Sequence, residues 1–242
     1  MQALYCHLGL LDYRAAHELQ TALVHRRRHG ELERDLFLVT EHPGVFTLGR
    51  RGGLEHLLVS EDFLTGEGIA VIPIERGGDI TYHGPGQLIL YPIIDLRRAG
   101  LSATGYVSRL EEVMLRLAGD WGVTAQRDPR NRGIWTGGKK LGSVGIAIRH
   151  GIAFHGLALN VNPSLTPFSW INPCGLTGVE MTSIAAESEC EVTLAQAESK
   201  LVKHLTEVFD REFREIAPEE IFRFSSSPLC PISPLGPWQS LQ

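Results

Sequence analysis

Residues 139–161 read KKLGSVGIAIRHGIAFHGLALNV, and the alternation of apolar side chains in this stretch predicts a β-hairpin. Apolar residues occupy every second position over residues 144–148 and again over residues 152–154. His150-Gly151 lies between the two runs and offers a two-residue turn. After the second run the apolar positions shift by one residue, so we expect a β-bulge near His155-Gly156.

Helical and strand-like patterns lie on both sides of this hairpin. Apolar residues recur at helical spacing in three segments, residues 12–30, 107–119 and 193–208. Asp12 can cap the first segment, and Thr193 opens the third with Gln196 in the capping-box position. Strand-like runs occupy residues 36–40, 69–74, 88–96, 144–149, 152–161 and 181–184. Because strands and helices do not alternate regularly, we expect an α+β fold, with a mixed β-sheet and flanking helices, and not a doubly wound parallel sheet.

The bulk composition fits one globular domain. Of the 242 residues, 43% are hydrophobic and 21% are charged, which is enough to build a sizeable core. The last stretch is rich in Ser and Pro and shows neither the helical nor the strand period. We therefore expect a single domain over residues 1–223 and a mobile tail over residues 224–242.

Charge and cysteine usage indicate the compartment and the class of partner. The formal net charge of -5 argues against a nucleic-acid-binding protein. The chain shows no basic start followed by an apolar segment and no run of about 18 apolar residues, so we expect neither secretion nor a membrane span. Four scattered cysteines fit free thiols in a reducing compartment, and we expect a cytoplasmic protein.

A glycine-rich block, RGGDITYHGPGQ at residues 76–87, uses residue types that a plain connection between strands rarely needs. Glycines let backbone N–H groups approach a ligand closely, and Arg76, Tyr82 and His83 add donors around it. The block therefore indicates a binding site. The alternative is a strained loop with a hydrogen-bonded histidine.

Two adjacent lysines, Lys139 and Lys140, stand at the entrance of the predicted hairpin. The stretch that begins at Gly133 almost fits the phosphate-binding pattern G-x-x-x-x-G-K-[ST], but Lys140 replaces the metal-binding hydroxyl. A hairpin also follows where that pattern requires a helix, so we reject a nucleotide-binding loop. A solvated pair of lysines remains the alternative to a functional amine.

Cys174 lies between a proline and a glycine, in a turn that would hold a nucleophilic thiol in place. An inert buried thiol is the alternative, and sequence alone does not bring Cys174 and Lys140 together. The histidines offer no metal-binding spacing. His150 and His155 flank a turn without an evident third ligand, so we expect no metal site.

Together these segments resemble the lipoyl(octanoyl) transferases, which transfer octanoyl groups to proteins in lipoate biosynthesis. The resemblance rests on four ordered motifs between Glu41 and Thr182: EHPGVFTLGR, RGGDITYHGPGQLILYPIIDL, KKLGSVGIAIRHGIAFHGLALNV and INPCGLTG. It does not extend to the Ser/Pro-rich tail. It implies an acyltransferase domain with a fold similar to the catalytic domain of biotin and lipoate ligases, a cytoplasmic setting, and no metal or other cofactor.

The resemblance also implies roles for individual residues. Cys174 corresponds to the cysteine that carries the acyl group as a thioester, and Lys140, which precedes the Leu-Gly-Ser-Val-Gly run, corresponds to its partner lysine. The residues that correspond to the octanoyl site are Arg76, Gly77, Gly78, Asp79, Ile80, Thr81, Tyr82, His83, Ser143, Val144, Gly145, Gly156, Leu157 and Ala158. The implied donor is octanoyl-acyl carrier protein. The implied acceptors are the lipoyl domains of 2-oxoacid dehydrogenase complexes and the H protein of glycine cleavage.

The implied reaction exchanges one thioester for another and then forms an amide, so it needs no ATP. We expect backbone N–H groups near Cys174 and in Gly77-Gly78 to contact the oxyanion. Basic residues at 26–28 and 50–51 either dock an acidic carrier protein or are simply solvated. Two alternatives stay open: an ATP-dependent ligase for lipoate or biotin with the same fold, and a non-enzymatic binding module in which Cys174 and Lys140 are dispensable.

Overall fold

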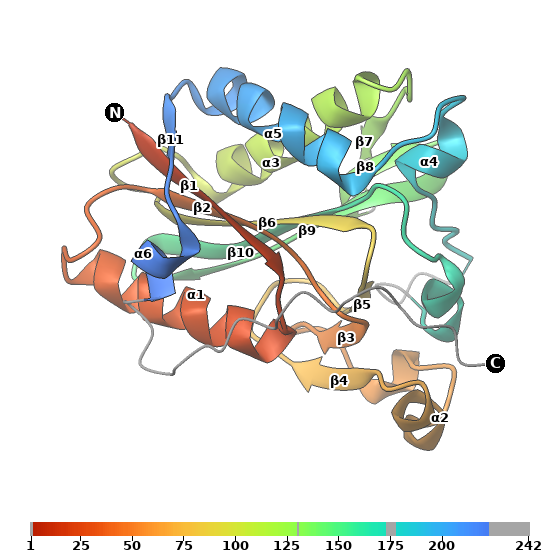
Figure 1. The fold of residues 1–242 in the computed structure, drawn as a ribbon. Coiled ribbons are helices and arrows are strands. Elements are labelled where there is room, and N and C mark those ends of the chain that lie inside the picture. Colours follow the sequence, from red (N-terminus) through yellow and green to blue (C-terminus); the bar gives the residue numbers. More distant parts are fainter. Residues whose placement is uncertain (1, 130, 173–177, 223–242) are drawn as a thin grey trace.

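The computed structural model describes residues 2–129, 131–172 and 178–222, and it contains a large and a small β-sheet (Figure 1). The large sheet has the order β11-β1-β2-β6-β10-β9-β8-β7. Its strands are β1 Ala3–Leu10, β2 Leu36–Glu41, β6 Gln87–Asp95, β7 Gln126–Asp128, β8 Asn131–Thr136, β9 Lys139–Arg149, β10 Ile152–Asn160 and β11 Phe213–Glu215. The small sheet has the order β4-β3-β5, with β3 Val45–Leu48, β4 Ala70–Pro73 and β5 Ile80–His83.

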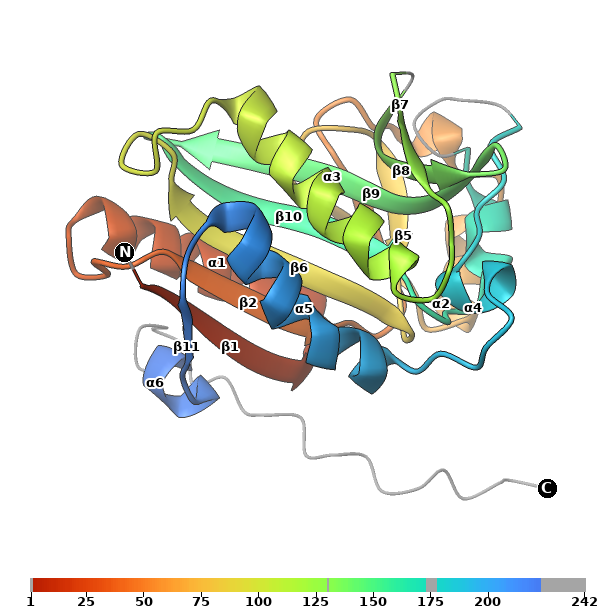
Figure 2. The same ribbon diagram turned by 90° about the horizontal axis from the view of Figure 1, so that it is seen from above.

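Helices cover both faces of the large sheet (Figure 2). α3 (Ala103–Gly119) and α5 (Leu194–Phe209) pack on one face, and α1 (Tyr13–Arg28) packs on the other. Shorter helices are α2 Glu61–Gly66, α4 Ile184–Glu187, α6 Pro218–Phe222, and the 3₁₀ turns η1 Leu54–His56 and η2 Thr166–Trp170. β1 pairs in parallel with β2 and β11 while β6 pairs antiparallel with its neighbours, which confirms the expected mixed sheet with flanking helices. The expected tail, residues 224–242, lies outside the described residues.

The three expected long helices are present, and two of them begin at the predicted capping residues. The Asp12 carboxylate accepts hydrogen bonds from the N–H groups of Arg14 and Ala15 at the start of α1. Thr193 and Gln196 form a capping box at the start of α5. These caps satisfy N–H groups that no helical carbonyl reaches, so they fix where each helix begins. Within the described ranges, no helix is both long and apolar enough to cross a membrane.

The β9–β10 hairpin is confirmed, but the expected bulge is wrong. The two turn residues have φ angles of 55° and 86°, as a type I′ turn requires, and pairing runs without a shift from the turn to Leu159 opposite Gly142. β10 is buried on both faces, with Phe154 packed in the α1 core and Leu157 in the α3–α5 core. The change of apolar phase therefore marks a change in which face carries the bulky side chains. His155 adopts a φ of 54° without adding a residue.

The expected strand at residues 181–184 is also wrong. Met181 forms a parallel bridge with Lys140, and Ile184 already begins α4. The Ser183 hydroxyl caps that helix by accepting a hydrogen bond from the N–H of Ala186 at 3.1 Å, so local capping overrides the short apolar run. The strands that the sequence patterns did not predict are β1, β3, β5, β7, β8 and β11.

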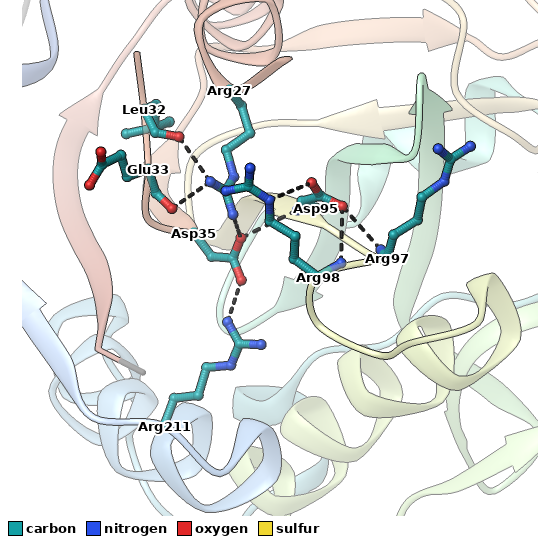
Figure 3. A network of polar contacts seen from close by, with 8 residues as sticks. All are labelled: Arg27, Leu32, Glu33, Asp35, Asp95, Arg97, Arg98 and Arg211. Carbon is teal, nitrogen blue, oxygen red and sulfur yellow. Dashed lines mark hydrogen bonds and ion pairs between the residues drawn. The ribbon is translucent and has the colours of Figure 1, made fainter. Parts of the chain in front are cut away.

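A buried network of charges ties α1 to β2, β6 and the end of α5 (Figure 3). Asp35, in the turn before β2, accepts hydrogen bonds from Nη2 of Arg27 at 2.8 Å and from Arg211, which follows α5. The N–H of Asp95, at the end of β6, donates to the same carboxylate at 3.3 Å. Arg27 also donates to the carbonyl of Leu32 at 2.9 Å. One carboxylate thus joins helices on both faces to the sheet between them.

Asp35→Asn is expected to lower the free energy of unfolding by about 3 kcal/mol, because it removes the counter-charge of a buried guanidinium. Denaturant titration followed by circular dichroism measures the loss. Glu31→Gln is the matched control, since Glu31 pairs with Arg26 at the exposed surface, where a single pair contributes at most about 1 kcal/mol. Equal losses in the two variants would show that the buried network adds nothing beyond a surface pair.

Candidate active site

A cleft opens between the glycine-rich block and the β9–β10 hairpin. The N–H of Gly77 donates to the carbonyl of Ile146 at 2.9 Å and so joins the two walls. The predicted octanoyl-site residues that line the cleft are Arg76, Gly77, Gly78, Asp79, Ile80, Thr81, His83, Ser143, Val144, Gly145, Gly156, Leu157 and Ala158. Three stretches that are far apart in the sequence therefore meet in one cavity.

Tyr82 is the predicted site residue that the fold turns away from the cleft. Along β5, Ile80, Thr81 and His83 line the cleft, whereas Tyr82 does not. The Tyr82 ring packs against Phe46 and Phe168, with centroids 5.4 Å apart in each pair. Tyr82 therefore belongs to the hydrophobic packing of the small sheet.

Arg76 fixes the conformation of the glycine-rich block. Its guanidinium donates to the carbonyl of Thr47 at 2.7 Å, to the hydroxyl of Thr47 at 2.8 Å and to the carbonyl of Gly77 at 3.2 Å. Gly78 follows with a φ of 93°, a conformation that residues with a Cβ rarely adopt. The block is thus anchored to β3 of the small sheet as well as to β9.

Lys140 is buried in the wall of the cleft, while Lys139 points to solvent. Only 3% of Lys140 is exposed, and its Nζ lies 5.4 Å from the centroid of the Trp135 ring. Its backbone N–H donates to the carbonyl of Glu180, and its carbonyl accepts from the N–H of Thr182. The Lys139 side chain is 40% exposed and lies 3.3 Å from the Glu180 carboxylate, which raises the pKa of Lys139. Burial of Lys140 disfavours the alternative of a solvated pair.

Cys174 lies outside the described residues, as does the rest of the predicted nucleophile turn, residues 173–177. Before the turn, the N–H of Asn172 donates to the carbonyl of His56 at 2.8 Å. The ring of His56 lies 2.7 Å from the carboxylate of Asp79, which lines the cleft. After the turn, Met181 lines the cleft directly. The described chain after Cys174 therefore reaches the cleft, and the chain before it is linked to the cleft through His56 and Asp79.

The cysteines that the structure describes lie away from the cleft lining. Cys6 is buried in β1, and burial raises the pKa of its thiol to about 12. Near neutral pH such a thiol supplies almost no thiolate, which is the reactive species. Cys190 is exposed in the segment between α4 and α5.

Two buried histidines and two tyrosines support the inner end of the cleft. His83 lines the cleft, its Nδ1–H donates to Oε1 of Gln87 at 3.2 Å, and its ring stacks on Tyr13. Nδ1 of His42 donates to a backbone carbonyl, so Nε2 accepts a hydrogen bond from the Tyr91 hydroxyl at 2.8 Å. Burial lowers the pKa of His42 to about 4 and holds the pKa of His83 well below its usual value. Both rings are therefore neutral at pH 7.

Some cleft residues were not identified from the sequence. They are Tyr13, Tyr91, Asn131, His155 and Met181. They come from different elements and meet only through tertiary packing, so no local spacing connects them. Tyr91 and His155 could have been recognised from the sequence, because each is a polar residue within a strand that is otherwise apolar on both faces.

Gly156→Ala is expected to lower the free energy of unfolding by about 3 kcal/mol, at the upper end of the usual cost of overpacking. A Cβ at this position would lie 2.1 Å from the carbonyl oxygen of Leu90, so β10 and β6 must separate. Gly119→Ala at the end of α3 is the control, because a Cβ there meets nothing within 4 Å. Thermal and denaturant unfolding of both variants measure the difference, and a Gly156→Ala protein as stable as the control would contradict this packing.

Known proteins match this chain over most of its length. The sequence profile of the lipoyl protein ligase A/B catalytic domain matches residues 12–206. The octanoyltransferase of Desulfotalea psychrophila is 54% identical over 204 residues, which cover 84% of this chain and 92% of that protein. The octanoyltransferase of Syntrophobacter fumaroxidans is 44% identical over 220 residues, 91% of this chain and 96% of that protein.

Among solved structures, lipoate-protein ligase A bound with ATP superposes with a TM-score of 0.75 at 17% identity, covering 95% of this chain and 98% of that one. At this identity the likeness establishes the fold and leaves the activity to the closer sequence relatives. The profile match and the high identity over most of both chains agree with the arrangement of the glycine-rich block, the hairpin and Lys140 around one cleft. The chain therefore belongs to the octanoyltransferases, and its catalytic domain is that of the lipoyl protein ligase A/B family.

Proposed function

We propose that this chain transfers an octanoyl group from octanoyl-acyl carrier protein to a lysine of a lipoyl domain, through a thioester on Cys174 with Lys140 as the proton acceptor. The observation that carries the proposal is the burial of Lys140 in the wall of the cleft that the predicted acyl-site residues line. The identity to octanoyltransferases supports the nature of the acyl group.

In the first half-reaction, the thiolate of Cys174 attacks the carbonyl carbon of the octanoyl thioester. A free thiol with a pKa of about 8.5 is only a few per cent ionised near pH 7, so a neighbouring amine that accepts its proton raises the reactive fraction. A carbon–sulfur bond forms to Cys174, and the bond to the carrier's thiol breaks. That thiol leaves with the proton that Lys140 held. One thioester replaces another, so the free energy changes little.

In the second half-reaction, the ε-amine of a lysine on the lipoyl domain attacks the enzyme thioester. A carbon–nitrogen bond forms and the carbon–sulfur bond to Cys174 breaks. Lys140 accepts the proton that the amine releases and returns it to the departing thiolate. Formation of an amide from a thioester is downhill, so the reaction requires no nucleotide.

The hydrogen bonds of the glycine-rich block limit which of its backbone N–H groups are available to stabilise the oxyanion. The N–H of Gly77 is already donated to the carbonyl of Ile146. Of the Gly77-Gly78 pair, Gly78 is therefore the proposed donor from this side, together with a backbone N–H near Cys174.

The proposed acceptors are the lipoyl domains of 2-oxoacid dehydrogenase complexes and the H protein of glycine cleavage, and the proposed location is the cytoplasm. Arg27 does not belong to the suggested docking surface for the carrier protein, because it is buried against Asp35. The exposed side chains of Arg28, Arg50 and Arg51 remain available to an acidic partner.

Transfer in the absence of ATP tests the proposal against the ligase alternative. Purified protein is incubated with octanoyl-carrier protein and a lipoyl domain without nucleotide, and the mass of the lipoyl domain is followed. We expect addition of one octanoyl group, and none when the acceptor lysine is replaced by arginine. Modification only with free octanoate and ATP would identify a ligase, and no modification in either reaction would favour a binding module.

A further inference from the structure

Three side chains outside the proposed catalytic pair converge at one edge of the cleft. His17 comes from α1, Glu75 from the segment between β4 and the glycine-rich block, and His155 from the middle of β10. Their potential ligand atoms all lie within 4.8 Å of one another. We propose that these residues form a binding site for Zn²⁺ or a similar divalent transition-metal ion.

The two separations that involve Glu75 lie close to the value expected for tetrahedral coordination. Oε2 of Glu75 lies 2.8 Å from Nε2 of His17 and 3.7 Å from Nε2 of His155. Zinc bonds of about 2.0–2.1 Å to nitrogen and oxygen place neighbouring tetrahedral ligands about 3.3 Å apart. The two contacts bracket this separation, so small side-chain adjustments suffice. Two imidazoles and a carboxylate are a donor set that Zn²⁺ takes, with a fourth position for water.

The His155 ring gives independent support for a ligand at this position. Its side chain is only 2% exposed, and neither ring nitrogen has a hydrogen-bond partner among the described residues. A buried polar group without a partner destabilises the fold unless something else meets it. An ion bound at Nε2 would give that nitrogen a partner. Because His155 also lines the cleft, the site adjoins the cleft at this residue.

A residue outside the proposed ligand set orients the Glu75 carboxylate. Arg149 donates to Oε1 of Glu75 at 3.1 Å, which turns Oε2 toward the two histidines. In this arrangement Arg149 holds the Glu75 carboxylate without touching the ion, and Glu75 is the ligand.

An ion at this site would join three parts of the chain that border the cleft. It would link α1 to β10 and to the residue that directly precedes Arg76 of the glycine-rich block. We therefore expect Zn²⁺ to raise the midpoint of thermal unfolding by several degrees. Mg²⁺ should have a much weaker effect, because imidazole ligands favour transition metals over hard cations.

Metal titration of the full chain tests the proposal without any acyl donor, so its outcome is independent of the transfer assay. The protein is first treated with chelator, and Zn²⁺ affinity is then measured by competition with a chromophoric chelator. Visible absorption of the Co²⁺ form distinguishes nitrogen and oxygen ligands from thiolates. The variants are His155→Ala and Glu75→Gln, and His150→Ala is the matched control because His150 is an exposed histidine of the same hairpin.

We expect wild type and His150→Ala to bind about one Zn²⁺ per chain without thiolate absorption. Both ligand variants should weaken binding by more than about 100-fold, beyond the loss typical for an outer contact. Should His155→Ala fail to fold, Glu75→Gln decides, because glutamine keeps the size of the side chain and still accepts a hydrogen bond from His17. Unchanged affinity in Glu75→Gln, or no saturable Zn²⁺ binding by the wild type, would overturn the proposal.

Discussion

Replacing Cys174 by serine is expected to abolish the octanoyl-enzyme adduct and to slow transfer by about 1000-fold or more, because the proposed mechanism passes through a covalent bond to this sulfur. A serine hydroxyl does not ionise near pH 7 and is a far poorer nucleophile than a thiolate. An amine such as Lys140, which is able to accept a thiol proton, is too weak a base to make up that difference. The loss should therefore appear in the rate of adduct formation and in the overall transfer.

Intact-mass measurement after incubation with octanoyl-carrier protein checks this result. The wild type should gain one octanoyl group that hydroxylamine removes, as expected for a thioester, and Cys174→Ser should gain none. Cys190→Ser is the matched control, because Cys190 is the exposed cysteine among the described residues and should be dispensable. An adduct that survives in Cys174→Ser but disappears in Cys190→Ser would show that Cys190, and not Cys174, carries the acyl group.

The elements that the sequence predicted well are those whose information is local. Asp12 and Thr193 begin their helices where the capping patterns indicate, and His150-Gly151 makes the hairpin turn because both residues tolerate positive φ. The expected bulge in β10 was wrong because the strand is buried on both faces, which removes the polar positions that show register. The short strands of the small sheet were largely missed, since their pairing depends on partners that are distant in the chain.

The candidate site divides in the same way. The glycine-rich block and Lys140 could be identified because motifs mark them, and the structure brings them into one cleft. Tyr82 was grouped with that cleft because sequence does not reveal which face of β5 points inward. Tyr13 lies outside the motifs, and it reaches the cleft only because α1 packs on β10.

Replacing Lys140 by methionine is expected to slow both half-reactions, with overall transfer reduced by about 100-fold to 10,000-fold, the range that a positioned proton acceptor contributes. Methionine preserves most of the apolar stem against Trp135 and removes only the amine, so the fold should be retained. Single-turnover measurements of adduct formation and of octanoyl release to a lipoyl domain separate the two effects. Circular dichroism confirms that the variant is folded.

Lys139→Met is the matched control, because Lys139 is the adjacent residue on β9 but is exposed and paired with Glu180. It should transfer octanoyl at close to the wild-type rate.

His83→Ala distinguishes a proton acceptor from a residue that shapes the cleft. Burial keeps His83 neutral and its Nδ1–H is donated to Gln87, so its loss should slow acylation less than the loss of Lys140 does. If His83→Ala lost acylation as completely as Lys140→Met, the proton acceptor would have to be reassigned to the histidine. If Lys139→Met were the slower of the two lysine variants, burial in the cleft wall would not be what selects the functional amine.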